Sequence, residues 1–282
     1  MREICTLTKR NMLNYLRDKA SVFFSFLSII ILLGIYILFL KNIFNDIPLA
    51  TQAEKNTFML GYIMGGLIVV GTITLSLGII GNYVYDLATK KLNGLLVSPT
   101  SRYKLTLSYY LSTMILTFAL VLIMFFLSVL YLVISTGTCY SFLQILQVVG
   151  IILLYVLIST PIMVFIASFI NSTNAFAGVS SIVGTLIGFI SGIYIPLSLL
   201  DPFTKNLAGL LPFSHMALYL RKLLCGDTLN GIPLEALDSF GMGEIPLFGA
   251  NVPIYIIFIS SLVVSCILFF ISYLRMNKKQ VC

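Results

Sequence analysis

Residues 105–200 read LTLSYYLSTMILTFALVLIMFFLSVLYLVISTGTCYSFLQILQVVGIILLYVLISTPIMVFIASFINSTNAFAGVSSIVGTLIGFISGIYIPLSLL. These 96 consecutive residues contain no Asp, Glu, Lys or Arg. A helix needs about 20 apolar residues to cross a hydrocarbon core about 30 Å thick. At that length per crossing, the stretch predicts about three membrane-spanning helices joined by short turns.

The rest of the chain has the same character. Of its 282 residues, 59% are hydrophobic and 10% are charged, whereas a soluble domain carries about 25% charged residues. Apolar runs outside the uncharged stretch bring the predicted spans to six: residues 20–40, 58–84, 105–134, 142–170, 176–199 and 253–274. The sequence therefore predicts an all-α membrane protein, with residues 1–282 forming a single transmembrane domain.

The distribution of Lys and Arg predicts the orientation. Segments on the N-terminal side of the membrane hold twelve of the seventeen basic residues and three acids, a net charge of +9. Segments on the other side hold five basic and seven acidic residues, a net charge of −2. By the positive-inside rule, both termini are cytoplasmic in a multi-pass cell-membrane protein. The overall charge of +7 is thereby explained by topology, and no nucleic-acid partner is expected.

Residues 1–19 are predicted to form an interfacial helix rather than a cleavable signal, because they are mostly polar and the apolar run that follows is too long. Its apolar and basic residues would suit a surface of membrane lipids with anionic headgroups: Ile4, Leu7, Lys9, Arg10, Leu13, Leu16, Arg17 and Lys19. A solvated basic tail is the alternative interpretation.

The loop between spans two and three predicts a short amphipathic helix over residues 86–98, stopped by Pro99. Its spacing would gather three leucines on one side and leave two lysines in solvent: Leu92, Leu95, Leu96, Lys90 and Lys91. An exposed apolar patch suits docking of a cytoplasmic partner, and it equally suits a helix lying on lipid.

The segment between spans five and six, residues 200–251, predicts a pair of re-entrant half-helices followed by an external loop. Its second helix would run from 213 to 224, with Pro212 at the first position and Gly226 as the stop. It is too apolar for a free loop and too short to span, which favours burial against the bundle. His215 on this helix is more typical of a packed histidine than of a proton relay.

Glycines recur at helical spacing in two spans, at Gly61 and Gly65 in span two and at Gly184, Gly188 and Gly192 in span five. Small residues at this spacing let helix backbones approach closely. Packing within the chain is the simpler interpretation. The alternative is that these spans line a subunit interface or a transport pathway.

Charged groups are absent from all six predicted spans, whose polar groups are hydroxyls and amides. Ion-coupled transporters usually keep an acid, Arg or His within the bundle, so this composition favours an amphiphilic substrate moved by an external energy source. The chain contains no P-loop motif, so ATP would bind a separate subunit.

The five cysteines show no metal-ligand spacing, and no metal site or cofactor is predicted. Cys139 and Cys225 fall on the outer side, as two free thiols or as a disulfide.

Three segments resemble motifs of the type-2 ABC exporter permeases. Residues 95–105 resemble the pattern LL-x-S/T-P-x-S-R-x-x-L, and residues 191–198 resemble SG-x-x-x-P-x-S. Residues 212–224 are similar to the P-x-x-H … R-x-x-L outer helix of that family. The three occur in the family's order, and the resemblance covers essentially the whole chain. One departure is the stretch 87–93, which lacks the glycine and glutamate of the family's E/R-R-G-T-L-E run.

The resemblance implies six helices per subunit, a dimer with a second identical or homologous permease, and P-loop ATPase subunits that bind ATP and Mg on the cytoplasmic side. It implies ATPase coupling by the inner loop, with these residues: Asp86, Lys90, Lys91, Leu92, Leu95, Leu96, Ser98, Pro99 and Arg102. It implies an outer re-entrant lid with these residues: Pro196, Pro212, His215 and Arg221. In place of the family's acidic contacts, Lys90 and Lys91 are expected to pair with acids on the ATPase.

The sequence thus predicts the permease subunit of an ATP-driven exporter, itself not an enzyme, that moves a drug-like, peptide or lipid-linked amphiphile outward. The alternatives are an ion-coupled secondary transporter or a channel without an ATPase partner. A membrane-embedded enzyme would need clustered His, Asp or Glu, which the sequence does not provide.

Overall fold

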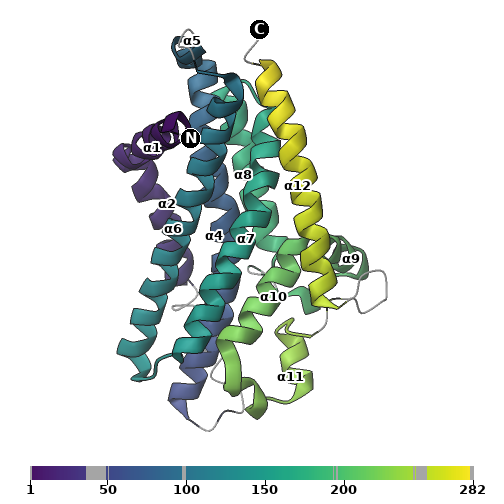
Figure 1. Cartoon of the computed structure of the whole chain (residues 1–282). Coiled ribbons are helices and arrows are strands. Elements are labelled where there is room, and N and C mark those ends of the chain that lie inside the picture. The colour runs from purple at the N-terminus through teal and green to yellow at the C-terminus, as the bar shows by residue number, and fades with distance from the viewer. Residues whose placement is uncertain are drawn as a thin grey trace.

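A computed structural model of the chain describes residues 2–35, 49, 51–96, 100–192, 194, 196–243, 245 and 253–279. Every regular element in these ranges is helical (Figure 1). In chain order the helices are α1 (Arg2–Arg17), α2 (Lys19–Ile35), α4 (Gln52–Ala88), α5 (Lys91–Leu96), α6 (Arg102–Thr136), α7 (Phe142–Ser168), α8 (Thr173–Ile190), η2 (Leu197–Leu199), α9 (Pro202–Leu210), α10 (Pro212–Cys225), η3 (Gly226–Gly231), α11 (Leu234–Ser239) and α12 (Ile254–Lys279).

Within the described residues, five helices are long and apolar enough to cross a membrane, and they correspond to predicted spans two to six. These helices are α4, α6, α7, α8 and α12. The chain is therefore an all-α, multi-pass membrane protein. The first predicted span, residues 20–40, begins with α2, and its residues 36–40 lie outside the described part of the chain.

Local signals in the sequence fix several helix ends. α4 begins after Thr51, whose hydroxyl accepts from the Glu54 amide at 3.2 Å while the Glu54 carboxylate accepts from the Thr51 amide at 3.1 Å. α6 ends at Gly137, which adopts the left-handed conformation with φ of 70°. α10 begins with Pro212 and ends before Gly226, as the sequence predicted.

α4 is the central helix of the bundle. In its most apolar stretch, 89% of the residues are buried inside the protein, because α2, α6, α7, α8 and α10 surround it. The hydroxyl of Ser76 lies 3.2 Å from those of Thr117 and Thr160, which joins α4 to α6 and α7. Such small polar residues let membrane helices pack closely.

α8 and α12 lie at the periphery of the bundle. Only 11% of the most apolar stretch of α8 and 17% of that of α12 are buried within the chain. Figure 1 shows α5 and both ends of the chain at one end of the bundle, and α11 at the opposite end. We call these the termini end and the far end.

Candidate functional site

The loop that was predicted to dock a partner lies at the termini end, but its helix differs from the predicted one. α4 continues to Ala88, the chain turns at Thr89 and Lys90, and α5 begins only at Lys91. Lys90 turns the chain because it adopts the left-handed conformation, with φ of 57°. The predicted helix over residues 86–98 is therefore wrong in its first turn, since Asp86 belongs to α4.

Leu92 and Leu95 of this loop face the bundle rather than solvent. Leu92 is only 1% exposed and lies in a cluster with Tyr83, Val84 and Leu105, and Leu95 packs partly buried against the same cluster. The predicted exposed apolar patch is therefore corrected at Leu92. Apolar side chains from α4 and α6 form a cluster beneath α5, and this cluster buries Leu92.

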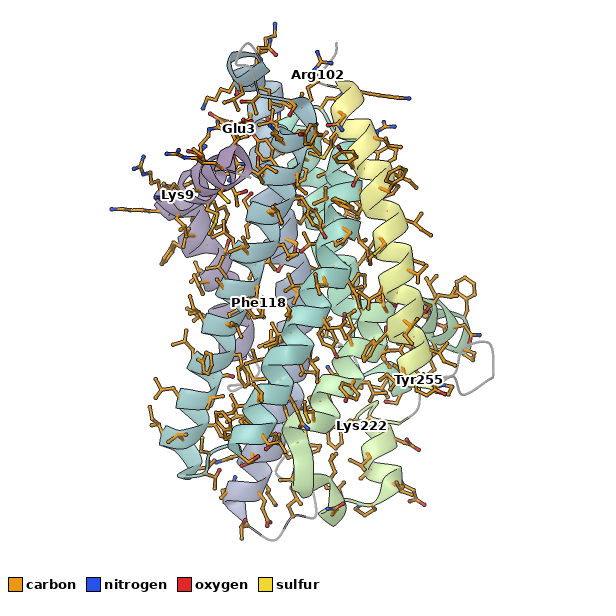
Figure 2. The ribbon with its side chains drawn as sticks, in the orientation of Figure 1. Glu3, Lys9, Arg102, Phe118, Lys222 and Tyr255 are labelled. Atoms are coloured by element: carbon orange, nitrogen blue, oxygen red, sulfur yellow. The ribbon has the colours of Figure 1, made fainter. Side chains whose placement is uncertain are left out.

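Polar residues occupy the exposed surface of α5 and its neighbours. Lys90 and Lys91 are exposed, as predicted, and Arg102, which Figure 2 shows at the termini end, is exposed as well. The Lys91 ammonium lies 4.7 Å from the centre of the Tyr85 ring. Of the remaining residues predicted for coupling, Ser98, Pro99 and the side chain of Leu96 lie outside the described part of the structure.

Asp86 is buried in an ion pair within the chain. Its Oδ2 lies 3.2 Å from Nη2 of Arg10 on α1 and accepts a hydrogen bond from the Tyr109 hydroxyl on α6 at 2.6 Å. Arg10 Nη1 also lies 3.5 Å from that hydroxyl. Asp86 is 5% exposed, so this carboxylate is not available to a partner. The assignment of Asp86 to an intermolecular coupling contact is corrected accordingly.

α1 rests on α6 through its polar side. Thr8, Asn11 and Tyr15 are buried, and Asn11 Nδ2 donates to Ser108 Oγ at 3.2 Å. The apolar residues Leu13 and Leu16 are exposed instead. An amphipathic helix over residues 1–19 was predicted, but its polar contacts with α6 were not. The sequence gives one signal for them, because Ser108 and Tyr109 are polar residues near the start of span three.

A second ion pair joins α1 to α6 at the surface. Lys104 Nζ donates to Glu3 Oε2 at 2.9 Å, and this ammonium lowers the pKa of the Glu3 carboxyl below its ordinary value. Figure 2 shows Glu3 at the termini end of the bundle. Together, the two ion pairs fix α1 against α6 and against the end of α4 from which the α5 turn departs.

The two short helices predicted as re-entrant are α9 and α10, and α10 runs toward the far end (Figure 1). α10 packs against α4 and α7 and buries most of its residues, although its length prevents it from spanning. His215 is 4% exposed, and its Nε2 lies 2.9 Å from the Gly209 carbonyl oxygen. It is the packed histidine that the sequence predicted. Pro212 starts α10, and Pro196 precedes η2.

Arg221 on α10 is buried at 2% exposure. Its Nε donates to the Tyr62 carbonyl at 3.1 Å and its Nη2 to the Gly192 carbonyl at 2.9 Å. The guanidinium carbon lies 4.1 Å from the centre of the Tyr62 ring. Among the described residues, no carboxylate forms an ion pair with it. Arg221 thus joins α10 to α4 and to the chain that leaves α8.

The glycines of span two are covered by α10. A Cβ at Gly65 would lie 2.7 Å from the Arg221 backbone nitrogen, and one at Gly61 would lie 2.9 Å from the Leu224 carbonyl carbon. Packing within the chain accounts for both positions. No surface is left there for a second subunit, so the interface interpretation is corrected for Gly61 and Gly65.

The glycines of span five do not form one continuous contact. A Cβ at Gly184 would touch the Thr74 methyl at 3.7 Å, and one at Gly188 would overlap the Tyr194 ring. Gly192 lies beyond the end of α8 and adopts a φ of 67°. The outward face of α8 instead carries exposed larger side chains, Ile182 at 61% and Leu186 at 53%.

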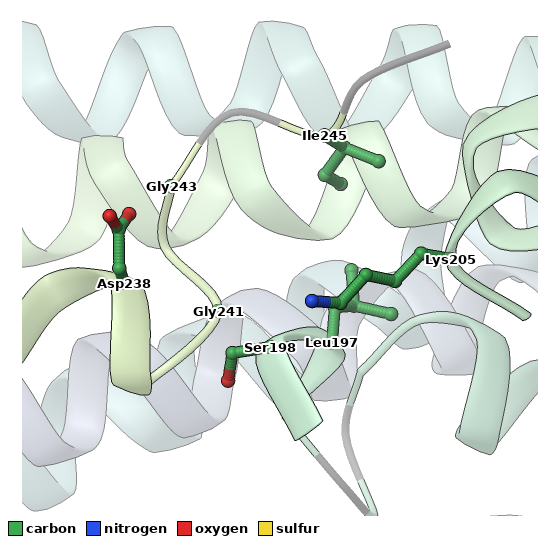
Figure 3. A pocket seen from close by; sticks show the side chains of 7 residues that line it. All are labelled: Leu197, Ser198, Lys205, Asp238, Gly241, Gly243 and Ile245. Carbon is green, nitrogen blue, oxygen red and sulfur yellow. The ribbon is translucent and has the colours of Figure 1, made fainter. Parts of the chain in front are cut away.

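Two hollows mark the far end. One, of about 300 Å³, lies beside η2, α9 and α11, and Figure 3 shows Lys205 and Asp238 among its lining residues. The other, of about 670 Å³, lies where α4 begins, α6 turns into α7 and α10 ends. Both Cys139 and Cys225 line this second hollow, and both are free thiols.

The family model described as ABC-2 type transporter matches residues 2–225, from α1 to the end of α10. The chain belongs to the ABC-2 type transporter family. It is thus a transport subunit rather than a catalytic one, and membership implies partnership with an ABC ATPase subunit. A search of curated proteins finds none that matches this ABC-2 chain.

Proposed function

We propose that this ABC-2 chain is the permease of an ATP-driven exporter, which pairs with a second permease and moves an amphiphilic substrate outward. The ATPase subunits would dock at the termini end, which we take as cytoplasmic. The observation that carries the proposal is the arrangement of this end. A short helix, α5, protrudes between α4 and α6, and the end of α4 from which it departs is tied to α1 through Asp86 and Arg10. Movement of a docked subunit would therefore reach three elements of the bundle at once.

The lack of charged residues in the six predicted spans supports an amphiphilic substrate. A cavity of about 300 Å³ lies between the α1–α2 elbow and α4, with hydroxyl and aromatic groups in its lining: Tyr15, Ser21, Phe24, Ser25 and Thr74. Gly78 leaves open space on the α4 side of this cavity. Uncharged hydroxyls beside aromatic rings suit a molecule with both polar and apolar parts. They include no Asp, Glu or His side chain to which a coupling ion could bind.

The exposed face of α8 supports pairing with a second permease. Ser181 and Thr185 lie on this face beside exposed Ile182 and Leu186. Hydroxyls on a helix face are more favourable against another helix or a polar pathway than against lipid tails. The glycine at 184 allows close approach on the side towards α4.

Membrane lipids are proposed as partners of α1. Its exposed Leu13 and Leu16 would enter the boundary of the lipid tails, while exposed Lys9 and Arg17 would lie among anionic headgroups. The basic side chains and the apolar ones share the part of α1 that α6 leaves uncovered.

Purification of the chain from its native cells in mild detergent tests the proposal. We expect an ATP-hydrolysing P-loop subunit to co-purify in a fixed ratio, and amphiphilic compounds to raise its turnover. A chain that purifies without any ATPase would contradict the proposal and favour a channel.

Cysteine cross-linking tests the pairing. In a chain whose own cysteines are replaced by serine, Leu186→Cys should form disulfide-linked dimers in the membrane. Ile187→Cys is the matched control, because Ile187 is only 5% exposed and lies on the side of α8 that packs within the chain. Equal cross-linking of both variants, or none with Leu186→Cys, would contradict pairing through α8.

A further inference from the structure

We propose that the hollow beside η2, α9 and α11 binds the headgroup of a zwitterionic phospholipid from the outer leaflet, in which Lys205 binds the phosphate and Asp238 binds a primary ammonium. The site rests on the orientation taken in the proposed function, with the far end outside, and it needs neither the ATPase nor the exported substrate. Asp238 lies beyond residue 225, where the family match ends, so membership of the family does not supply this site.

Two opposite charges line the hollow without pairing with each other. Figure 3 shows the Lys205 side chain entering it from one side and the Asp238 carboxylate on the other. Among the described residues, neither side chain forms an ion pair. A ligand that carries both charges would meet the opposite sign at each end, whereas a ligand with one kind of charge would be repelled by one of the two groups. The hollow therefore suits a zwitterion.

The walls of the hollow are held by contacts within the chain. The Ser198 hydroxyl donates to the Ser239 carbonyl at 2.7 Å, which joins η2 to α11. Gly241 follows α11 with a φ of 67°, and a Cβ there would lie 2.9 Å from a backbone nitrogen of η2. A Cβ at Gly243 would overlap the Asp238 carboxylate, so only glycine leaves that carboxylate its room. The volume of about 300 Å³ suits a headgroup rather than a whole lipid.

The outward side of α9 is apolar. Phe203, Leu207 and Leu210 are exposed at helical spacing. Figure 1 shows α9 at the side of the bundle, near the level at which α12 begins. That level is a membrane boundary, because α12 is a span and the exposed Tyr255 lies at its beginning (Figure 2), as in the aromatic belts of membrane proteins. The apolar side of α9 would therefore meet lipid tails, with the hollow beside the headgroups.

This juxtaposition favours a lipid over a free zwitterion. Lys205 lies two positions from both Phe203 and Leu207, so it projects from the other side of α9. One short helix thus touches tails with one side and lines the charged hollow with the other, and a lipid meets both conditions because its tails and headgroup are joined. A primary ammonium is favoured over a quaternary one, since only the primary ammonium donates hydrogen bonds to the Asp238 carboxylate.

Tryptophan fluorescence tests the site, because the chain contains no tryptophan of its own. The Phe203→Trp variant is placed in vesicles of phosphatidylethanolamine, phosphatidylcholine and phosphatidylglycerol, one of which carries brominated tails that quench the fluorescence. We expect the strongest quenching from brominated phosphatidylethanolamine. Leu234→Trp, an exposed position on α11 outside the hollow, is the control and should show no preference. Equal quenching of Phe203→Trp by all three lipids would overturn the headgroup site, and no quenching would overturn the contact of α9 with lipid.

Substitutions at the two charges test their roles. Asp238→Asn and Lys205→Gln should each retain about fivefold less phosphatidylethanolamine through purification in detergent, as measured by mass spectrometry, with a smaller difference at high salt. Glu235→Gln is the matched control, because Glu235 is exposed on the same helix but does not line the hollow. All three side chains are at least partly exposed, so these variants should melt as the wild type does. Equal retention by Asp238→Asn and Glu235→Gln would overturn the proposal.

Soluble phosphoethanolamine distinguishes a lipid from a free zwitterion. We expect it to displace little of the retained phosphatidylethanolamine, because it lacks the tails that contact α9. Full displacement, together with unchanged lipid retention in Leu207→Ser, would overturn the lipid assignment in favour of a free zwitterion. The exporter proposal fails separately. If an ATPase co-purifies and the lipid preference is absent, only the headgroup site fails, whereas a lipid preference without any ATPase contradicts only the exporter.

Discussion

Arg10 and Arg221 hold opposite ends of the bundle by different means. Arg10, at the termini end, pairs with the Asp86 carboxylate, and its side chain is still 31% exposed. Arg221, at the far end, is almost completely buried and relies on two backbone carbonyls and the Tyr62 ring. A carboxylate can be replaced by mutation, whereas a carbonyl is present whatever the side chain. The termini end is therefore joined by a contact between two side chains. The far end is joined by one side chain that donates hydrogen bonds to the main chain.

This difference predicts unequal tolerance of change. The Arg10–Asp86 pair can break and reform, because water can solvate the partly exposed Arg10 guanidinium while Asp86 keeps its hydrogen bond from Tyr109. A buried guanidinium has no such alternative, and its carbonyl acceptors also need its donors. We therefore expect the termini end to adjust during transport and the far end to keep its contacts.

The largest effect is expected at Arg221. Arg221→Gln should destabilise the chain by about 3 kcal/mol or more, because it leaves the Tyr62 and Gly192 carbonyls buried without their donors. Thermal unfolding in detergent measures this effect. Arg221→Lys should restore little, since an ammonium lacks the planar fork that reaches both carbonyls and stacks on the ring. The control is Lys222→Gln at the exposed neighbouring position, and equal melting of all three variants would remove the contrast with Arg10.

A smaller effect is expected where α10 meets α4. Gly65→Ala should cost about 1–3 kcal/mol, because its Cβ would lie 2.6 Å from Arg221 Cγ and 2.7 Å from the Arg221 nitrogen. Gly78→Ala in the same helix is the control. No atom lies within 4 Å of its Cβ position, and Ala favours the helix over Gly by up to about 1 kcal/mol. If both variants melt alike, the close approach of α10 is not what holds the far end.

The ion pair at the termini end should matter less for stability. Asp86→Asn should cost about 1–2 kcal/mol, because the partner arginine is partly exposed, and it should open α1 to proteolysis. The exchange Arg10→Asp/Asp86→Arg should recover part of the loss. No exchange of side chains should rescue Arg221→Gln, whose acceptors are backbone. Failure of the exchange at Arg10 together with rescue at Arg221 would reverse the comparison.

The surface pair Glu3–Lys104 is expected to have the smallest effect. Lys104 lowers the pKa of Glu3, so the pair stabilises α1 above the ordinary carboxyl pKa and ceases to do so as the pH falls through the lowered value. Glu3→Gln should therefore resemble the wild type at acidic pH and differ slightly at neutral pH in low salt. Protease sensitivity of α1 against pH measures this, and a difference that grows in acid would contradict it.

The fold could be predicted from sequence where composition alone decides it. A stretch without charge reveals membrane helices, and capping residues such as Pro212 and Gly226 mark their ends. The helix α10 could also be predicted from composition, because it is apolar and too short to span. The six-helix count rests partly on residues 36–40, which lie outside the described chain.

The contacts between distant segments could not be predicted. Arg10 and Asp86 are separated by 76 positions and Arg221 and Tyr62 by 159, and nothing in the local pattern pairs them. Leu92 and Leu95 lie on one side of the inner loop, as predicted, but their spacing could not reveal whether that side would meet lipid, a partner or the bundle itself. Leu92 faces the bundle because Tyr83, Val84 and Leu105 come together beneath it.

The central position of α4 has a consequence for how the chain is made. α4 leaves the ribosome early, whereas α10, which covers its glycines, is synthesised more than a hundred residues later. During that interval Gly61 and Gly65 form a groove without side chains. The growing chain does not yet contain α10, the helix that covers this groove. The bundle can reach its final packing only after α10 has turned back into it. Biogenesis therefore proceeds from an incomplete centre, which is closed by a helix made well after it.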